Sequence, residues 1–274
     1  MRGGLQIMNI TLLLGLVVGF GGVLFGYIED GGVLSALLKI SSMSIVFGGT
    51  FGIMLMSNPM SRLKKVPAAL KLVFQGKKQN FAELIDIVMD VSVVARRDGL
   101  LALETEAGKY DNPILKKGLA YIADGISPER LKQNLYAESD AQLADYEDAA
   151  KVFDSMGGAA PTCGVLGTVM GMVSILRSMS GSDMDSLGGK IATAFIATMF
   201  GVGSANLMWL PIGSTIKALA EEQESYNHIL IEGLLSIQAG EYPSRIREYL
   251  IAMCGPENSK GISADNKAGG ESGK

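Results

Sequence analysis

Two threonines lie well inside long apolar stretches of the sequence, where a hydroxyl group has few partners. Thr168 belongs to the run from Gly157 to about Met179, and Thr198 belongs to the run from Leu187 to about Ile216. Either hydroxyl could hydrogen-bond a carboxylate, an ordered water or a partly dehydrated cation. Alternatively, each could bond the carbonyl four residues earlier in its own helix, as serine and threonine often do. The residues alone leave both possibilities open.

The two runs carry no Asp or Glu in their middles. Charged side chains near the centre of a bilayer are costly, so acids inside membranes usually mark proton or cation relays. If this chain helps to move an ion, the carboxylate that receives the ion must therefore come from another polypeptide. Arg177 and Lys190 lie at the outer ends of the runs, where their charged heads can reach the interface.

The elements that position the two hydroxyls are predicted to be membrane-spanning helices, because about 20 apolar residues cross the roughly 30 Å of hydrocarbon. Both runs are rich in small residues, and Gly167-x-x-x-Gly171 has a spacing that lets helices approach closely in lipid. Two further spans are predicted at about Ile10–Ile28 and Met43–Met56. The second of these ends at Asn58–Pro59, since the residue before proline disfavours helix.

The charges that flank the spans predict their orientation. A basic cluster follows the second span and marks the cytoplasmic side. It comprises Arg62, Lys64, Lys65, Lys71, Lys77 and Lys78. The loops between spans one and two and between spans three and four are acidic, which fits the outside. The acids are Glu29, Asp30, Asp183 and Asp185. The sequence therefore predicts four spans in the cytoplasmic (inner) membrane, with both termini in the cytoplasm.

The predicted fold is all-α, a four-span helical membrane protein with a helical cytoplasmic domain between spans two and three. Its segments are transmembrane helices in 1–58, the cytoplasmic domain in 59–156, transmembrane helices in 157–216, cytoplasmic helices in 217–254 and a disordered tail in 255–274. Asn80, with Glu83 three residues later, predicts a helix start. Ser127–Pro128 predicts another, which is expected to run toward span three.

Composition narrows the functional class. The chain has 274 residues, and its 48% hydrophobic content supports membrane insertion. Its net charge of −4 gives no argument for nucleic-acid binding. One histidine and two cysteines offer no metal-ligand spacing. No nucleophile–base constellation and no internal inverted repeat occurs, so neither a membrane enzyme nor a secondary transporter is favoured. We expect no catalytic site and no cofactor.

Each run also contains one proline, Pro161 near the start of the first and Pro211 near the end of the second. A proline removes a helical hydrogen bond and can bend the helix. The predicted topology places both residues toward the cytoplasmic leaflet. They are either simply tolerated, as prolines often are in membrane helices, or they form hinges that link the spans to the cytoplasmic domain.

Four motifs follow one another along the chain. They are Gly48-Gly49-Thr50-Phe51-Gly52, Arg96-Arg97-Asp98-Gly99-Leu100-Leu101-Ala102-Leu103-Glu104, Pro161-Thr162-Cys163-Gly164-Val165-Leu166-Gly167-Thr168, and Thr198 with Pro211. Over roughly residues 8–253, this combination resembles the MotA/PomA family, the larger subunits of the bacterial flagellar stator.

The resemblance implies a pentamer around a dimer of a second, single-span subunit, MotB or PomB. That partner would carry the ion-binding aspartate and a peptidoglycan-binding domain, which agrees with the missing acid in this chain. Ion passage would turn the pentamer around the anchored dimer, and cytoplasmic charges would engage the rotor protein FliG. The chain is then a channel subunit that converts an ion gradient into rotation.

Particular residues match positions of known role in the family. Arg96, Arg97 and Glu104 match rotor-facing charges, Pro161 and Pro211 match prolines tied to coupling, and Thr168 and Thr198 match positions that line the ion path. On one continuous helix, Arg97 and Glu104 would share a face, with Arg96 rotated by roughly a quarter turn. A plain solvated face is the alternative for such charges.

Two questions stay open at this stage. The ExbB/TolQ energy transducers also surround a single-span partner, but they have three spans and an external N-terminus. The ion is a proton or sodium. By the family resemblance, Thr168 occupies a site where sodium-type members are similar to this sequence, whereas Ala197 precedes Thr198 where sodium-type members tend to have a second hydroxyl. Because fewer oxygen ligands make the sodium hydration shell harder to replace, the sequence favours protons.

Overall fold

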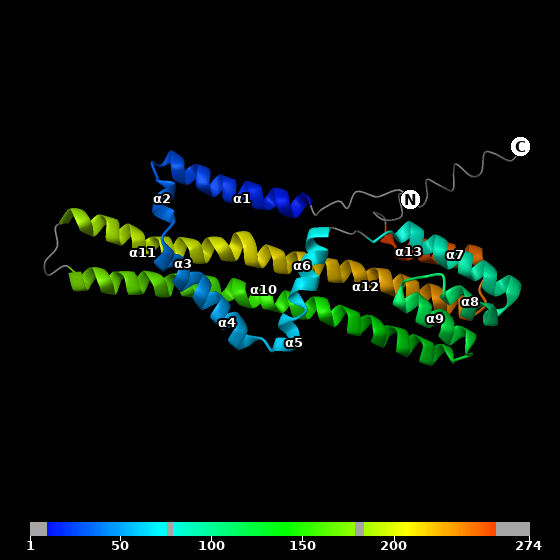
Figure 1. The fold of residues 1–274 in the computed structure, drawn as a ribbon. Helices are drawn as coiled ribbons and strands as arrows, with labels where there is room; N and C mark the ends of the chain where they lie inside the picture. Colours follow the sequence, from blue (N-terminus) through cyan, green and yellow to red (C-terminus); the bar gives the residue numbers. More distant parts are fainter. Residues whose placement is uncertain (1–9, 76–78, 179–183, 256–274) are drawn as a thin grey trace, which may run out of the picture. The chain divides into compact units, whose positions relative to one another are not determined.

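The computed structural model describes residues 10–75, 79–178 and 184–255, and helices make up its regular structure, with no strand in those ranges (Figure 1). Within the described ranges, four helical segments are long and apolar enough to cross a membrane, judged by length and composition. Both findings agree with the predicted all-α, four-span fold. The elements are α1 Ile10–Glu29, α2 Leu34–Leu37, α3 Ile40–Met43, η1 Ser44–Gly48, α4 Gly49–Ser57, α5 Met60–Leu63, α6 Val66–Gln75, α7 Phe81–Asp98, η2 Leu100–Ala102, α8 Leu103–Ala107, α9 Pro113–Ala123, α10 Pro128–Ser178, α11 Met184–Ser204, η3 Ala205–Trp209, α12 Leu210–Gln238 and α13 Pro243–Met253.

The chain divides into two compact units. The first consists of Met1–Lys77 and Asp145–Leu219, and the second of Lys78–Ala144 and Ala220–Lys274. These units differ from the predicted segments, because residues 60–75 and 145–156 lie in the unit that contains the apolar helices. Compactness does not locate a membrane, so the division into transmembrane and cytoplasmic segments stays a prediction. The predicted tail lies, from residue 256 onward, outside the described residues.

In the first unit, the second predicted span lies in a continuous helical segment, Ile40–Ser57, whose regular α-helix is interrupted only by a π-helical turn. After α2 and α3 come the π-helical turn η1 and then α4, which ends at Ser57 because Asn58 is extended (φ −126°, ψ 130°) before the proline. The buried hydroxyl of Thr50 donates to the Val46 carbonyl within this region, at 2.6 Å. The interruption was not predicted, since no Gly or Pro pattern marks a π turn.

The core of the first unit lies between α10 and the segment formed by η3 and α12, with α6 packed against both. These elements contribute buried apolar side chains, which are Ala69, Val73, Ala149, Ala150, Val152, Phe153, Met156, Ala160, Ala205, Trp209, Ile212 and Ile216. As predicted, the helix that begins at Pro128 continues into the third span, and α10 is 51 residues long. At 1.5 Å per residue it measures about 76 Å, well beyond a bilayer core.

The second unit is built around α7, α8, α9, the start of α10, the end of α12, and α13. Its fully buried side chains include Leu84, Ile85, Leu103, Ile114, Leu119, Ile122, Leu131, Leu135, Leu230, Ile231 and Leu234. The predicted helix starts are confirmed: Asn80 Oδ1 accepts from the Glu83 amide at 3.2 Å. Asn112 caps α9 by accepting from two backbone amides at 3.0 and 3.1 Å.

Candidate functional site

The two threonines singled out in the sequence meet. Thr168 Oγ1 of α10 and Thr198 Oγ1 of α11 are 2.5 Å apart, so one hydroxyl donates to the other. Both side chains are half-buried. The pair therefore bridges the third and fourth spans at a place where the sequence supplies no acid.

Small residues allow this close approach. A methyl group added to Gly164 would lie 2.9 Å from the carbonyl oxygen of Ala197 and 3.2 Å from the Cα of Gly201. One added to Gly201 would lie 2.6 Å from the Ala160 carbonyl oxygen. The backbones of α10 and α11 are thus in direct contact, as the small-residue spacing predicted. One added to Gly167, within that spacing, would meet the methyl group of Ala197 at 2.7 Å.

Backbone carbonyls complete the oxygen cluster around the pair. Thr168 Oγ1 lies 3.0 Å from the Ala194 oxygen and 3.2 Å from the Gly164 oxygen, and Thr198 Oγ1 lies 3.4 Å from the same Gly164 oxygen. The alternative of a bond within one helix thus fits Thr168, whose contact with Gly164 is four residues back. Thr168 also contacts Ala194 and Thr198 on α11, and Thr198 reaches across to α10, so neither hydroxyl has a purely local role.

The cluster can accept as well as donate. Each threonine hydroxyl has one proton and two acceptor lone pairs, and one proton is used between the two side chains. An approaching carboxylate can accept a hydrogen bond from a hydroxyl group, and a protonated acid or the water of a hydrated cation can donate a hydrogen bond to a hydroxyl oxygen. No Asp or Glu occurs in residues 157–178 or 188–216. The chemistry of a relay therefore needs a group from outside these spans.

The two prolines lie in segments that pack on each other. A methyl group added to Gly157, four residues before Pro161, would collide with the side chain of Leu210, whose Cγ would be 2.7 Å away. Leu210 directly precedes Pro211 and follows the π-helical turn η3. α10 continues through Pro161 without a break. The wide turn η3 contains Leu207, whose carbonyl an amide at position 211 would have bonded in a regular helix, and proline has no such amide.

The charged residues near residue 100 do not lie on one helix. α7 ends at Asp98 because Gly99 adopts φ +85°, and η2 and α8 begin a new direction. The prediction that Arg97 and Glu104 share a helical face is therefore wrong, since the seven-residue spacing spans a helix end. Arg96 and Arg97 are at the end of α7, and Glu104 is exposed in the first turn of α8.

The two arginines have different surroundings. Arg97 forms a two-point ion pair with Asp98, with donor–acceptor distances of 2.9 and 2.7 Å. These hydrogen bonds raise the pKa of Arg97 and lower the pKa of Asp98. Arg96 instead lies with its guanidinium carbon 3.8 Å from the centre of the Tyr242 ring. The structure brings Arg96 and Arg97 together but shows no contact between either of them and Glu104.

Sequence reasoning missed an ion-pair cluster in the first unit. Lys65 contacts Asp145 at 2.8 Å and Asp148 at 2.7 Å, and Arg62 contacts Asp148 at 3.2 Å. The hydrogen bond from Lys65, helped by Arg62, holds the pKa of Asp148 below its ordinary value. The partners are at least 80 residues apart in sequence, so only the fold reveals them. Two residues of the predicted positive-inside cluster thus also join the helix that follows span two to α10.

Comparison with known proteins supplies a second, independent line of observation. Residues 106–228 match the family described as the MotA/TolQ/ExbB proton channel family, and residues 13–99 match the family described as Motility protein A N-terminal. The chain is 32% identical to Motility protein A of Bacillus subtilis over 89% of this chain and 90% of that protein. It is 30% identical to Motility protein A of Borreliella burgdorferi over 96% of this chain and 100% of that protein.

A solved structure agrees with these relatives. The flagellar MotAB stator complex from Bacillus subtilis contains a chain that superposes with a TM-score of 0.84 at 30% identity, covering 92% of this chain and 99% of that chain. The match extends over nearly the whole length of both chains. The agreement therefore concerns the complete helical arrangement and not one shared motif.

Proposed function

Because the chain belongs to the Motility protein A family, we propose that it forms, with a single-span MotB-like partner, an ion channel that drives flagellar rotation. The proposal places it in the inner membrane with both termini in the cytoplasm. The main support is the contact between Thr168 Oγ1 and Thr198 Oγ1, which are 2.5 Å apart and connect two spans that contain no acid. A carboxylate supplied by the partner, an aspartate by family resemblance, would complete the path.

The hydroxyl pair suits a carboxylate that changes its protonation state. A charged carboxylate accepts a hydrogen bond from a threonine hydroxyl, whereas the protonated acid donates a hydrogen bond to a threonine oxygen. The pair can turn its hydroxyls to meet both forms without moving the helices. Hydrogen bonds to charged groups contribute about 1.5–3 kcal/mol, so losing one should slow ion transfer by about 10- to 100-fold.

The test compares matched removals of a hydroxyl group. Thr198→Val, in complex with the partner, should lower ion flux into proteoliposomes by about tenfold or more, whereas Thr198→Ser should keep most of it. Thr193→Val is the control, because Thr193 lies on the same helix and bonds its own helix at Gly189 O, 2.8 Å away. Equal flux in Thr198→Val and Thr193→Val would exclude the hydroxyl pair from the ion path.

Contact with a FliG-like rotor protein is proposed for Arg96, Arg97 and Glu104. All three are exposed in the second unit, and they match the family positions that face the rotor. Charge reversal at Arg96 or Glu104 should abolish swimming while the complex with the partner still assembles. Such contacts between exposed charges weaken with salt. Normal swimming in both reversals would remove the rotor assignment and leave the channel assignment in place.

The hinge role of Pro161 and Pro211 and the pentameric assembly are part of the same proposal. The contact between the two proline segments supports a joint role, since Leu210 packs on Gly157 and a movement of one segment is felt by the other. Pro211→Ala should reduce torque more than it reduces ion flux, if the bend links the spans to the rotor-facing unit. Mass measurement of the purified complex should give five copies of this chain per two of the partner.

The ExbB/TolQ alternative and the identity of the ion need separate measurements. Reporters of membrane topology fused to each terminus should place both in the cytoplasm; an external N-terminus would favour the ExbB/TolQ arrangement. The match of residues 13–99 to the Motility protein A N-terminal family supports the stator assignment. Swimming that stops with an uncoupler but continues without sodium would assign protons, and the reverse pattern would assign sodium.

A further inference from the structure

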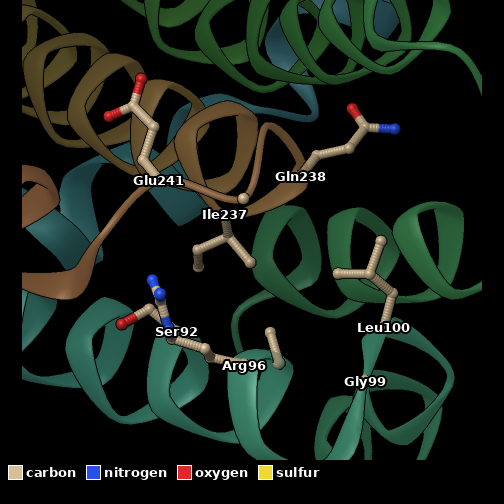
Figure 2. A pocket seen from close by; sticks show the side chains of 9 residues that line it. Ser92, Arg96, Gly99, Leu100, Ile237, Gln238 and Glu241 are labelled. Atoms are coloured by element: carbon tan, nitrogen blue, oxygen red, sulfur yellow. The ribbon is translucent and has the colours of Figure 1, made fainter.

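A pocket of about 320 Å³ opens in the second unit, between the C-terminal end of α7 and the turn that joins α12 to α13 (Figure 2). Its apolar lining comes from Ala95 on α7, Leu100 in η2 and Ile237 on α12. Arg96 and Glu241 supply charged groups at the same pocket. This volume is at the lower end of the range for small-molecule sites, a size that suits one or two side chains.

Two glycines shape the pocket by ending the helices that border it. Gly99 has φ +85° after α7, and Gly240 has φ +73° after α12. Residues with a side chain rarely adopt a positive φ, and this backbone conformation turns the chain sharply away from the helix axis. Neither glycine fills the space with a side chain, so the ends of two helices border a hollow.

Arg96 is held in place but lacks an anionic partner. Its guanidinium carbon lies 3.8 Å from the centre of the Tyr242 ring, which is close for a cation–π contact. Among the residues that the structure describes, no carboxylate lies within 4.0 Å of Arg96, although Glu241 lines the same pocket. The neighbouring Arg97 differs, because Asp98 already offsets its charge.

Three of the exposed apolar side chains of the second unit lie at the pocket or next to its lining residues. In the described part of the second unit, the large apolar side chains left exposed are Val93, Leu100, Leu101, Tyr242 and Tyr249. Leu100 lines the pocket, Leu101 follows it and is 77% exposed, and Tyr242 is 60% exposed beside Arg96. An exposed apolar patch next to an unpaired cation is the pattern expected of a protein-binding surface.

We propose that this pocket receives an acidic amphipathic helix of the rotor partner. An apolar side chain of that helix enters the pocket against Ile237, and a carboxylate about one turn away pairs with Arg96. Tyr242 is a positioning residue, since its ring fixes the direction of the guanidinium. Charge and shape favour this occupant: Arg96 has no carboxylate within 4.0 Å among the described residues and can pair with an acid, and the apolar lining beside it suits a hydrocarbon side chain. The inference rests on the proposed rotor contact and adds the α12–α13 turn to it.

The experiment measures binding of the purified rotor protein to the complex of this chain with its partner subunit. Tyr242→Leu removes the ring and should weaken binding by about 2- to 30-fold, the range of a cation–π contact. Tyr242→Phe keeps the ring and should bind like the unchanged protein. The binding of Tyr242→Leu should also depend less on salt, because its arginine is no longer held toward the carboxylate.

Filling the pocket gives a second and independent test. Ala95→Leu places a larger side chain in the pocket and should reduce rotor binding by tenfold or more. Val93→Leu is the control, because Val93 is exposed on the same helix and does not line the pocket. Ion flux through the complex should stay unchanged in all four variants, which also shows that they fold.

The outcomes separate this inference from the function on which it rests. Binding by Tyr242→Leu and Ala95→Leu that equals binding by Val93→Leu would overturn the pocket as the docking site, while the channel and rotor assignments would stand. Failure of the unchanged complex to bind the rotor protein at all would instead overturn the proposed rotor contact itself. Loss of binding in Tyr242→Phe as well as Tyr242→Leu would show that Tyr242 acts through its hydroxyl and not by holding Arg96.

Discussion

The packing of α10 on α11 gives the most direct prediction about the threonine pair. Gly201 lies one helical turn from Thr198, and a methyl group added there would be 2.6 Å from the carbonyl oxygen of Ala160. It would also be 2.9 Å from the Cα of Gly164. Both neighbours are backbone atoms, which cannot turn away as a side chain can. Gly201→Ala must therefore push the two helices apart.

The size of the displacement follows from these distances. Ordinary contact begins at 3.4 Å, so the helices must separate by about 0.8 Å at this level. An equal movement at the threonines would lengthen their 2.5 Å separation to about 3.3 Å, beyond the usual range for hydroxyl pairs. Overpacking of this kind costs about 1–3 kcal/mol of stability. The variant should lose stability and the hydroxyl contact together.

Two matched substitutions serve as controls. Gly203 on α11 and Gly158 on α10 have no atom within 4 Å of an added methyl group. Gly203→Ala and Gly158→Ala should keep detergent-unfolding stability or raise it by up to about 1 kcal/mol, because alanine favours a helix interior over glycine. Gly201→Ala should lower stability by about 1–3 kcal/mol and ion flux with the partner by about tenfold. Equal stability and equal flux for Gly201→Ala and Gly203→Ala would refute the close-packing argument.

Three further predictions concern the parts outside the spans. Asn112→Ala removes the cap of α9 and should cost about 1 kcal/mol in urea unfolding. The hydrogen bond from Lys65 lowers the pKa of Asp148. The ionised Asp148 therefore stabilises the fold fully above its ordinary pKa of 3.8, and this stabilisation is lost as the pH falls through the lower folded pKa. Asp148→Asn should lack this loss of stability in acid, as measured by unfolding at several pH values. Burial, and next the negative charge of Glu232, raise the pKa of Tyr136 to about 12. The neutral phenol therefore contributes fully to folding stability below pH 10, and this contribution is lost as the pH rises toward 12. Glu232→Gln should lower the pKa of Tyr136, as measured by ultraviolet titration.

Local signals in the sequence predicted most of the helices because they act over a few residues. The side chain of Asn80 caps α7, Pro128 starts α10 with its fixed φ, and Asn58 follows the end of α4 before a proline. Apolar length alone predicted the four spans. The meeting of Thr168 with Thr198 could be expected only in part, since small residues indicate that helices approach but not at which level they cross.

Features that depend on distant residues could not be predicted. A spacing of seven places Arg97 and Glu104 on one face only if the helix continues, and the left-handed Gly99 ends it. The position of Tyr242 over Arg96 joins two helices that are more than 140 residues apart in sequence. The π-helical turns depend on packing, and no pattern of residue types marks them.

The glycines and the threonines depend on each other: the close helix crossing at the glycines brings the two hydroxyls together. Two polar hydroxyls within apolar spans must find partners, because unsatisfied polar groups are costly there. At Gly164 the backbones come close enough for both threonines to share one carbonyl oxygen, at 3.2 and 3.4 Å. A wider crossing would leave each hydroxyl to bond its own helix, with nothing directed toward a third group. The narrow crossing instead joins the hydroxyls into one cluster, so any force that separates α10 from α11 also changes what that cluster can offer an ion.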